Sequence, residues 1–226
     1  MSFLINKYEK IKQELALKNV TLVAVSKTKP VSDIMEAYQA GQRDFGENYV
    51  QELLEKHESL PKDIRWHFIG HLQSNKVKYI APFVHLIHGT DSEKLLLEIN
   101  KQGQKLNRVI HCLLQIHISS EETKFGLDET ELEQMVSAIA IYPEKYKYVS
   151  IDGLMGMASF TEDNNLIMSE FKKLKTLFNK SKNFLAGTTH DFSILSMGMS
   201  ADYGLAIDEG STMVRIGSML FGSRNQ

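Results

Sequence analysis

The chain has 226 residues, 42% of them hydrophobic and 24% charged, a composition typical of one globular domain rather than a disordered or membrane-embedded chain. Lys and Arg number 26 against 28 Asp and Glu, and the net charge of −2 gives no reason to expect nucleic acid or an anionic membrane as a partner. No stretch approaches the ~20 apolar residues of a membrane span, the start does not resemble a signal peptide, and the single cysteine lies in an apolar segment, so we expect a cytoplasmic protein.

Eight short runs rich in β-forming residues alternate with helix-like segments along the chain. After a leading helix over 6–17, these runs span residues 21–26, 44–46, 66–70, 84–88, 108–118, 148–155, 194–197 and 213–217. Apolar residues spaced three and four apart predict helices between them. Strict alternation of strand and helix predicts a mainly parallel sheet, and eight units in about 200 residues favour a single α/β domain, a (β/α)8 TIM barrel, over an open doubly wound sheet.

Lys27 ends the first predicted strand, and Arg215 lies in the eighth. If the sheet closes, these strands are neighbours, and both side chains lie near the carboxyl ends of strands, where barrel enzymes build their sites. Partial burial and a neighbouring arginine both disfavour the charged form of a lysine, which frees the amine to attack an aldehyde. The alternative is a lysine that merely ends a strand and faces solvent.

Loops that contain glycine and serine follow the seventh and eighth predicted strands, at 196–200 and 217–218. Barrels commonly bind phosphate at these two loops, through backbone N–H groups and hydroxyls, and glycine lets the backbone approach the anion. Ser200 could instead cap a helix, because caps use the same residue types. Two such loops beside the strand of Lys27 favour the nucleophilic role for that lysine.

Seven segments, in order along nearly the whole chain, carry a family resemblance. They are Ala-Val-Ser-Lys-Thr-Lys-Pro at 24–30, Phe-Gly-Glu-Asn-Tyr-Val-Gln-Glu at 45–52, Trp-His-Phe-Ile-Gly-His-Leu-Gln-Ser-Asn-Lys at 66–76, Gly-Leu-Met at 153–155, Leu-Ser-Met-Gly-Met-Ser-Ala-Asp at 195–202, Gly-Ser-Thr-Met-Val-Arg-Ile-Gly-Ser at 210–218 and Phe-Gly at 221–222. With these segments the chain resembles the pyridoxal phosphate homeostasis proteins, single-domain relatives of the N-terminal barrel of alanine racemase.

This resemblance implies a protein that binds pyridoxal phosphate (PLP) reversibly as a lysine Schiff base and takes part in its intracellular homeostasis. It implies PLP-dependent apoenzymes as partners and no catalytic residue. The cofactor-binding residues that it implies are Lys27 as the Schiff-base lysine, Arg215 facing the pyridine nitrogen, Ser196, Ser200, Gly217 and Ser218 around the phosphate, and Asn48 close to the ring.

An arginine at the pyridine nitrogen bears on catalysis. Enzymes that use the ring as a strong electron sink place a carboxylate there and keep the nitrogen protonated, whereas arginine stays charged itself and cannot take up that proton. Transamination and decarboxylation are therefore disfavoured, but racemisation is not, because alanine racemases also use an arginine. Those racemases draw a tyrosine base from a second domain. We expect no such domain after Gln226, and Met157 stands at the position of a racemase histidine.

We therefore expect a carrier or regulator of PLP. A residual PLP-dependent amino-acid racemase is the alternative, and a cofactor-free Schiff-base aldolase is a third class. Because the racemase dimer relies on the second domain, we expect a monomer.

For the remaining polar residues we predict structural roles or assign no role. His67 and His71 lack a third ligand nearby in the sequence, so we expect no metal site. Glu47 and Glu52 are expected to brace a loop and to supply charge at a helix start. Lys29 and Lys124 lie near the predicted mouth of the barrel, with no role assigned.

Overall fold

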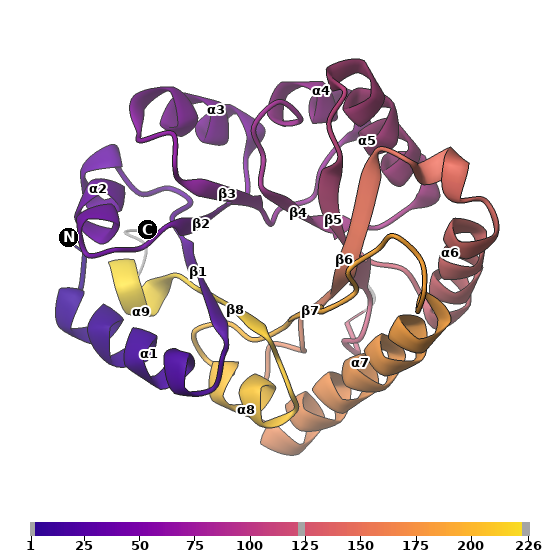
Figure 1. Cartoon of the computed structure of the whole chain (residues 1–226). Helices are drawn as coiled ribbons and strands as arrows, with labels where there is room; N and C mark the ends of the chain where they lie inside the picture. Colours follow the sequence, from indigo (N-terminus) through magenta and orange to yellow (C-terminus); the bar gives the residue numbers. More distant parts are fainter. Residues whose placement is uncertain (1–2, 122–124, 223–226) are drawn as a thin grey trace.

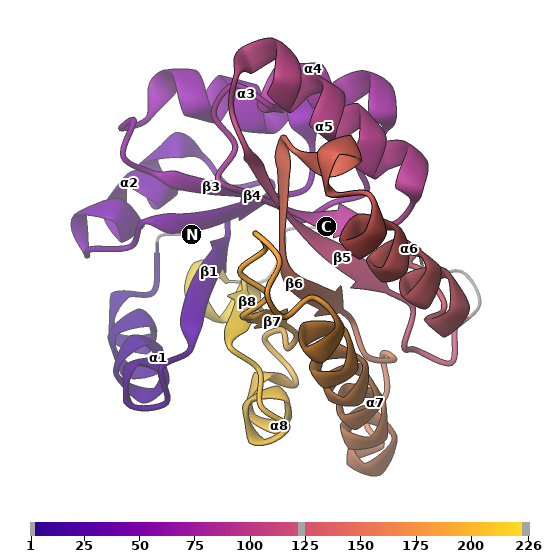
Figure 2. The same ribbon diagram turned by 45° about the vertical axis from the view of Figure 1, so that its right-hand side comes forward.

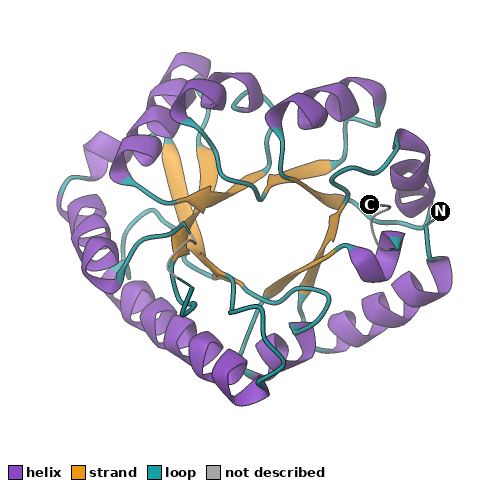
Figure 3. Ribbon diagram, turned by 180° about the vertical axis from the view of Figure 1, so that it is seen from behind, coloured by secondary structure: helices purple, strands orange, loops and turns teal. Residues whose placement is uncertain are grey.

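The computed structural model describes residues 3–121 and 125–222. Eight parallel strands pair in sequence order, and β8 closes the ring by pairing with β1. Helices surround this ring on its outside (Figures 1 and 3). The predicted TIM barrel is confirmed, and the open doubly wound sheet is excluded, because an open sheet would leave its first and last strands unpaired with each other.

The strands are β1 (Thr21–Val25), β2 (Asp44–Glu47), β3 (Arg65–Phe68), β4 (Leu86–Thr90), β5 (Ile110–Ile116), β6 (Val149–Gly156), β7 (Ile194–Ser196) and β8 (Met213–Ile216). The helices assigned within the described residues are α1 (Ile5–Leu17), α2 (Val31–Gln39), α3 (Val50–Ser59), α4 (Val77–Ile80), α5 (Glu93–Leu106), α6 (Glu129–Ile141), α7 (Asn164–Phe184), α8 (Tyr203–Asp208) and α9 (Ser218–Phe221), with 3-10 turns η1 (Ser74–Lys76) and η2 (Pro143–Tyr146).

The fourth strand lies further along the chain than the sequence predicts. The predicted run was 84–88, whereas β4 is Leu86–Thr90. The Val84 N–H still donates a hydrogen bond to the Ile80 carbonyl oxygen, so Val84 belongs to the turn that ends α4. Apolar composition alone could not separate this turn from the strand, because both are buried.

Strand side chains alternate between two apolar clusters. Leu22 and Ala24 of β1 join the larger cluster, which lies between the strands and the surrounding helices. Val23 joins the smaller one, to which other strands contribute Leu86, Leu113, Met155 and Met213. The smaller cluster fills part of the barrel interior, so the barrel is a packed core rather than a pore.

The longest helix, α7, runs along the outside of the barrel (Figure 2) and packs against β6. Within the described ranges, none of the helices combines the length and apolar character needed to cross a membrane. All strand pairs are parallel, so the carboxyl ends of the strands gather at one mouth of the barrel.

Candidate functional site

A cavity of about 810 Å³ opens at the carboxyl ends of the strands. The predicted site residues that line it are Lys27, Asn48, Ser200, Arg215, Gly217 and Ser218. These side chains follow or belong to β1, β2, β7 and β8, so closure of the barrel brings together residues from both ends of the chain.

The backbone before Lys27 is held by a buried ion pair. Glu47, at the end of β2, accepts hydrogen bonds on Oε1 from the Ser26 hydroxyl at 2.6 Å and from Lys56 Nζ at 2.7 Å. Lys56 Nζ also donates to the Ser26 carbonyl oxygen at 2.8 Å. Burial raises the pKa of Glu47, and the Lys56 ammonium opposes that rise. The pair fixes Ser26 and with it the start of the turn that carries Lys27.

The backbone after Lys27 is held from the first turn of α3. The Thr28 N–H donates to Glu52 Oε1 at 2.6 Å, and Lys56 Nζ donates to the same oxygen at 2.6 Å. Thr28 has a φ of 64°, a left-handed conformation that a β-branched residue adopts only when its surroundings stabilise it. Glu47 braces the loop and Glu52 lies in the first turn of α3, as predicted, whereas the bond from Thr28 to Glu52 was not foreseen. Sequence reasoning missed Lys56, whose only signal is its spacing of four residues from Glu52.

Arg215 lies deeper in the barrel than Lys27. It pairs in register with Val23, four residues before Lys27, and is buried. Its NH1 group donates to the Ser196 carbonyl oxygen at 3.0 Å and to Ser196 Oγ at 2.7 Å, and its NH2 group donates to the Gly156 carbonyl oxygen at 3.1 Å. Burial lowers the pKa of Arg215 to about 10, so the guanidinium remains charged at neutral pH.

Ser196 is not among the residues that line the cavity. Its side chain is fully buried on β7, and its Oγ lies 2.7 Å from Arg215 NH1 and 3.2 Å from His88 Nδ1. The structure therefore places Ser196 beneath Arg215 instead of at the predicted phosphate loops. In a three-residue strand, sequence alternation is too short to tell which face each side chain occupies.

The two predicted phosphate loops meet at the cavity. The Gly217 N–H donates to Ser200 Oγ at 3.3 Å, which joins the loop after β7 to the loop after β8. A Cβ at Gly217 would lie 3.2 Å from the Val25 carbonyl oxygen, so a larger residue would press on β1. The first N–H groups of a helix have no acceptor within the helix and suit an anion. In α9 these are the N–H groups of Ser218 and Met219.

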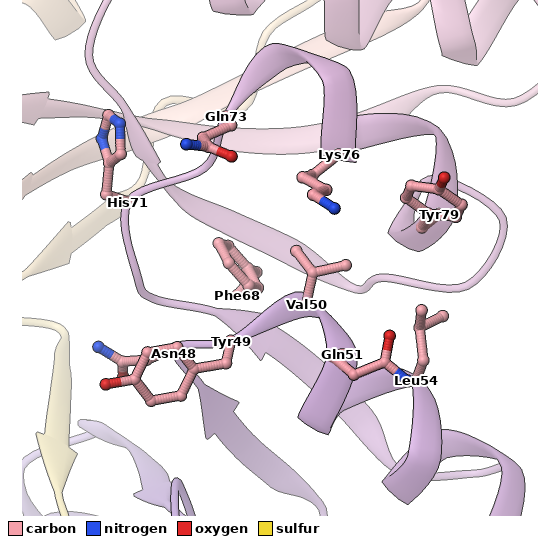
Figure 4. A pocket seen from close by; sticks show the side chains of 10 residues that line it. All are labelled: Asn48, Tyr49, Val50, Gln51, Leu54, Phe68, His71, Gln73, Lys76 and Tyr79. Atoms are coloured by element: carbon pink, nitrogen blue, oxygen red, sulfur yellow. The ribbon is translucent and has the colours of Figure 1, made fainter.

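Asn48 follows β2 and lines both this cavity and a neighbouring groove of about 470 Å³. Figure 4 shows the groove, with Asn48 and Tyr49 on one wall and His71 and Lys76 on the other. Asn48 Oδ1 is buried and makes no hydrogen bond to the residues that the structure describes. A buried amide oxygen in that state is costly, so the Asn48 amide suits a polar group of a ligand.

His67 and His71 face different surroundings. His71 Nδ1 lies 3.2 Å from Asp91 Oδ2, whereas His67 is buried with its Nε2 atom 3.0 Å from Asp44 Oδ1. At the amino-end mouth of the barrel, ligand atoms of Asp44, His67 and His85 lie within 4.8 Å of one another. The sequence analysis did not foresee this grouping, because its members come from three different strands or strand ends.

Lys29 lies at the rim of the cavity and is tied to the end of α9. Its Nζ atom donates to the Phe221 carbonyl oxygen at 2.7 Å and to the Gly222 carbonyl oxygen at 3.3 Å. Lys29 therefore links the turn after β1 to the segment that carries Ser218. Lys124 lies outside the described residues.

This eight-stranded barrel matches a known class of domain. The family model described as "Alanine racemase, N-terminal domain" matches residues 2–225, so the chain belongs to this family. Alanine racemase from Bartonella henselae, solved with covalently bound pyridoxal phosphate, has the same fold, with a TM-score of 0.68 at 17% identity. The match covers 96% of this chain and 58% of that racemase.

Relatives of similar length specify the branch of this family. The pyridoxal phosphate homeostasis protein of Vibrio alginolyticus is 40% identical over 97% of this chain and 93% of its own length. That of Schizosaccharomyces pombe is 41% identical over 95% of this chain and 88% of its own length. PipY of Synechococcus elongatus PCC7942 is 32% identical to this chain. Its structure without PLP superposes with a TM-score of 0.89, over 97% of this chain and 100% of the PipY chain. Its structure with PLP bound gives a TM-score of 0.86, over 96% of this chain and 99% of the PipY chain. The chain is thus a member of the pyridoxal phosphate homeostasis protein family, as its motifs predicted.

Proposed function

We propose that this protein binds pyridoxal phosphate reversibly and takes part in its intracellular homeostasis. The observation that carries the proposal is the cavity in which Lys27, Arg215 and the two glycine-serine loops converge. PipY, a solved relative, has been obtained with PLP bound, and the curated relatives carry the homeostasis name.

Each part of the cavity suits one part of the cofactor. Lys27 would hold the cofactor through its aldehyde, the group with which a lysine amine can form a Schiff base. Arg215 has three of its five N–H groups bonded to Ser196 and Gly156, which holds the guanidinium that we assign to the ring nitrogen. Around the phosphate and the ring we assign Ser200, Gly217, Ser218 and Asn48.

We infer that holding the cofactor, and not turnover, is the function. Arg215 stays charged and cannot protonate the ring nitrogen, which leaves the ring a weak electron sink. Met157 lines the cavity with a thioether that transfers no proton. PLP-dependent apoenzymes that receive the cofactor, a cytoplasmic location and a monomeric state complete the proposal.

Residual racemase activity is the second candidate, because an arginine at the ring nitrogen is the arrangement expected of the related racemases. Solvent deuterium exchange at the α-carbon of a panel of amino acids distinguishes the two functions. We expect no exchange above that of free PLP. Exchange that depends on Lys27 would establish the racemase instead.

The covalent role of Lys27 is tested by borohydride trapping. We expect purified protein mixed with PLP to show a violet absorption band, and borohydride to fix one cofactor on Lys27, measured by peptide mass. Lys27→Ala should lose both signals. Lys29→Arg is the matched control, since it removes the other described amine of the cavity while keeping a donor for the end of α9. A trapped cofactor in Lys27→Ala would contradict the assignment.

A further inference from the structure

A continuous line of hydrogen bonds crosses the barrel interior from Arg215 to the amino-end mouth. Arg215 NH1 lies 2.7 Å from Ser196 Oγ, which lies 3.2 Å from His88 Nδ1. His88 Nε2 lies 2.9 Å from His67 Nδ1, and His67 Nε2 lies 3.0 Å from Asp44 Oδ1. All five side chains are buried, and they come from β8, β7, β4, β3 and β2, which surround the barrel axis in Figure 1.

The two ends of this line determine where its hydrogens lie. A guanidinium only donates, and an ionised carboxylate only accepts. Burial by itself would raise the pKa of Asp44, but hydrogen bonds from His67 and Arg65 hold it far below its usual value, so the carboxylate is ionised. When each imidazole carries one hydrogen, His67 donates from Nε2 to this carboxylate and accepts on Nδ1, and His88 does the same.

Ser196 completes the sequence of donors and acceptors. Its Oγ accepts from Arg215, so its own hydrogen is directed at His88 Nδ1. Every bond then points from Arg215 toward Asp44. Burial also lowers the pKa of His88 well below its usual value, which agrees with a neutral ring.

We propose that Ser196, His88, His67 and Asp44 are positioning residues that hold the Arg215 guanidinium in place for the cofactor. The inference rests on the proposed function, in which Arg215 faces the ring nitrogen. We call the line of hydrogen bonds from Arg215 through Ser196, His88 and His67 to Asp44 the relay. Each acceptor atom of the relay faces Arg215, so the aligned dipoles and the terminal carboxylate stabilise the buried charge of the guanidinium. The relay compensates for the burial that disfavours a charged arginine.

A metal ion on Asp44, His67 and His85 would require the opposite arrangement. To bind a metal, His67 Nε2 would have to give up its hydrogen, and Nδ1–H would then donate to His88. That change reverses the direction of the relay. Arg65 already donates to both oxygens of Asp44, which further disfavours a cation there. The hydrogen-bond pattern therefore favours the relay over a metal site.

The tautomers can be measured without the cofactor. In cofactor-free protein labelled with ¹⁵N-histidine, long-range ¹H–¹⁵N spectra at neutral pH should show His67 and His88 as neutral Nε2–H tautomers. Single substitutions to Gln assign the two signals. An Nδ1–H tautomer at either residue, as a metal ion on His67 would impose, would overturn the proposal.

Two substitutions test whether the relay acts on the cofactor. Ser196→Ala removes the first acceptor, and Asp44→Asn removes the charge at the far end. We expect both to release PLP about 10-fold faster and to shift the absorption band of the bound cofactor. Ser196→Ala removes a hydrogen bond to the charged Arg215, and Asp44→Asn removes the carboxylate that aligns the other bonds of the line. His111→Asn is the matched control, because His111 binds Asp152 at the same mouth but lies outside the relay.

Circular dichroism establishes that the variants are folded before their spectra are compared. Release rates within about twofold of the unsubstituted protein and an unmoved band in Ser196→Ala would overturn the proposal, since this substitution is small and adjacent to Arg215. If the unsubstituted protein fails to hold PLP, the proposed function fails, and the tautomer measurement still decides whether the relay exists.

Discussion

Lys56 links the segments that hold Lys27 in place. Its ammonium lies within 2.8 Å of the Ser26 carbonyl oxygen and of carboxylate oxygens from Glu47 and Glu52. Glu47 is fully buried, so removing its partner leaves an uncompensated charge in the interior. One buried cation therefore controls the turn at the mouth of the barrel.

We predict that Lys56→Met lowers the free energy of unfolding by about 3–5 kcal/mol at neutral pH, the usual cost of breaking a buried ion pair. Burial already raises the pKa of Glu47, so this carboxyl contributes stability that is present below its ordinary value of 4.5 and is lost as pH rises through its folded pKa. Without Lys56 that pKa rises further, and the loss in Lys56→Met should shrink as pH falls.

Urea unfolding at about pH 7 and about pH 5 measures this difference. The double variant Lys56→Met with Glu47→Gln is the control, and it should recover part of the lost stability because the fully buried charge of Glu47 is also removed. Equal losses in Lys56→Met at the two pH values would contradict the prediction.

At the scale of the element, β6 departs from regular strand geometry next to β7. Asp152 has no counterpart on β5, which makes a bulge, and its carboxylate lies 2.7 Å from His111 Nδ1. Gly153 follows with a φ of 152°, and a Cβ there would lie 1.7 Å from the Ile194 carbonyl oxygen. Only glycine fits between the two strands at this point.

We predict that Gly153→Ala lowers the free energy of unfolding by at least about 3 kcal/mol, because backbone strain and overpacking against β7 add. Gly187→Ala separates the two causes. Gly187 has a φ of 83° but open space around its Cβ position, so that variant should lose only the conformational cost of about 1–2 kcal/mol. Urea unfolding of both variants is the measurement, and similar losses would show that the contact with Ile194 does not matter.

At the scale of the whole molecule, closing the barrel places imidazoles in a low-dielectric interior. Burial lowers the pKa of His88 well below its usual value and that of His85, at the amino-end mouth, to about 4. Both rings bind protons more readily in the unfolded chain. They therefore contribute stability that is full above pH 6.5 and is lost as pH falls through their folded pKa values.

We predict that His88→Gln loses less stability than the unsubstituted protein when pH is lowered from about 7 to about 5, because it has no buried ring to protonate. The free energy of unfolding in urea across this range is the measurement. His71→Gln, at the opposite mouth, is the control for replacing an exposed imidazole. An unchanged slope in His88→Gln would show that His88 titrates normally in the folded barrel.

Local patterns in the sequence predicted the regular elements well. Strand and helix periodicities depend on neighbouring residues, and all eight predicted strands overlap observed ones, with ends that differ by at most two residues. The motif around Lys27 and the glycines near Ser200 and Ser218 likewise indicated the lining of the cavity. The position of Ser196 could not be predicted, because a one-residue step moves a strand side chain to the other face.

The sequence by itself determined the alternation of strands and helices, the family, and the choice of Lys27 and Arg215 as candidate site residues, because each of these is carried by a short continuous segment. Only the tertiary structure decided which polar groups meet inside the barrel. Ser196 and His88 are 108 residues apart, and Lys56 reaches Ser26 across 30. Such contacts depend on strand register and closure of the ring, so the surroundings of Lys27 and Arg215 became visible only once the eight strands had been brought together.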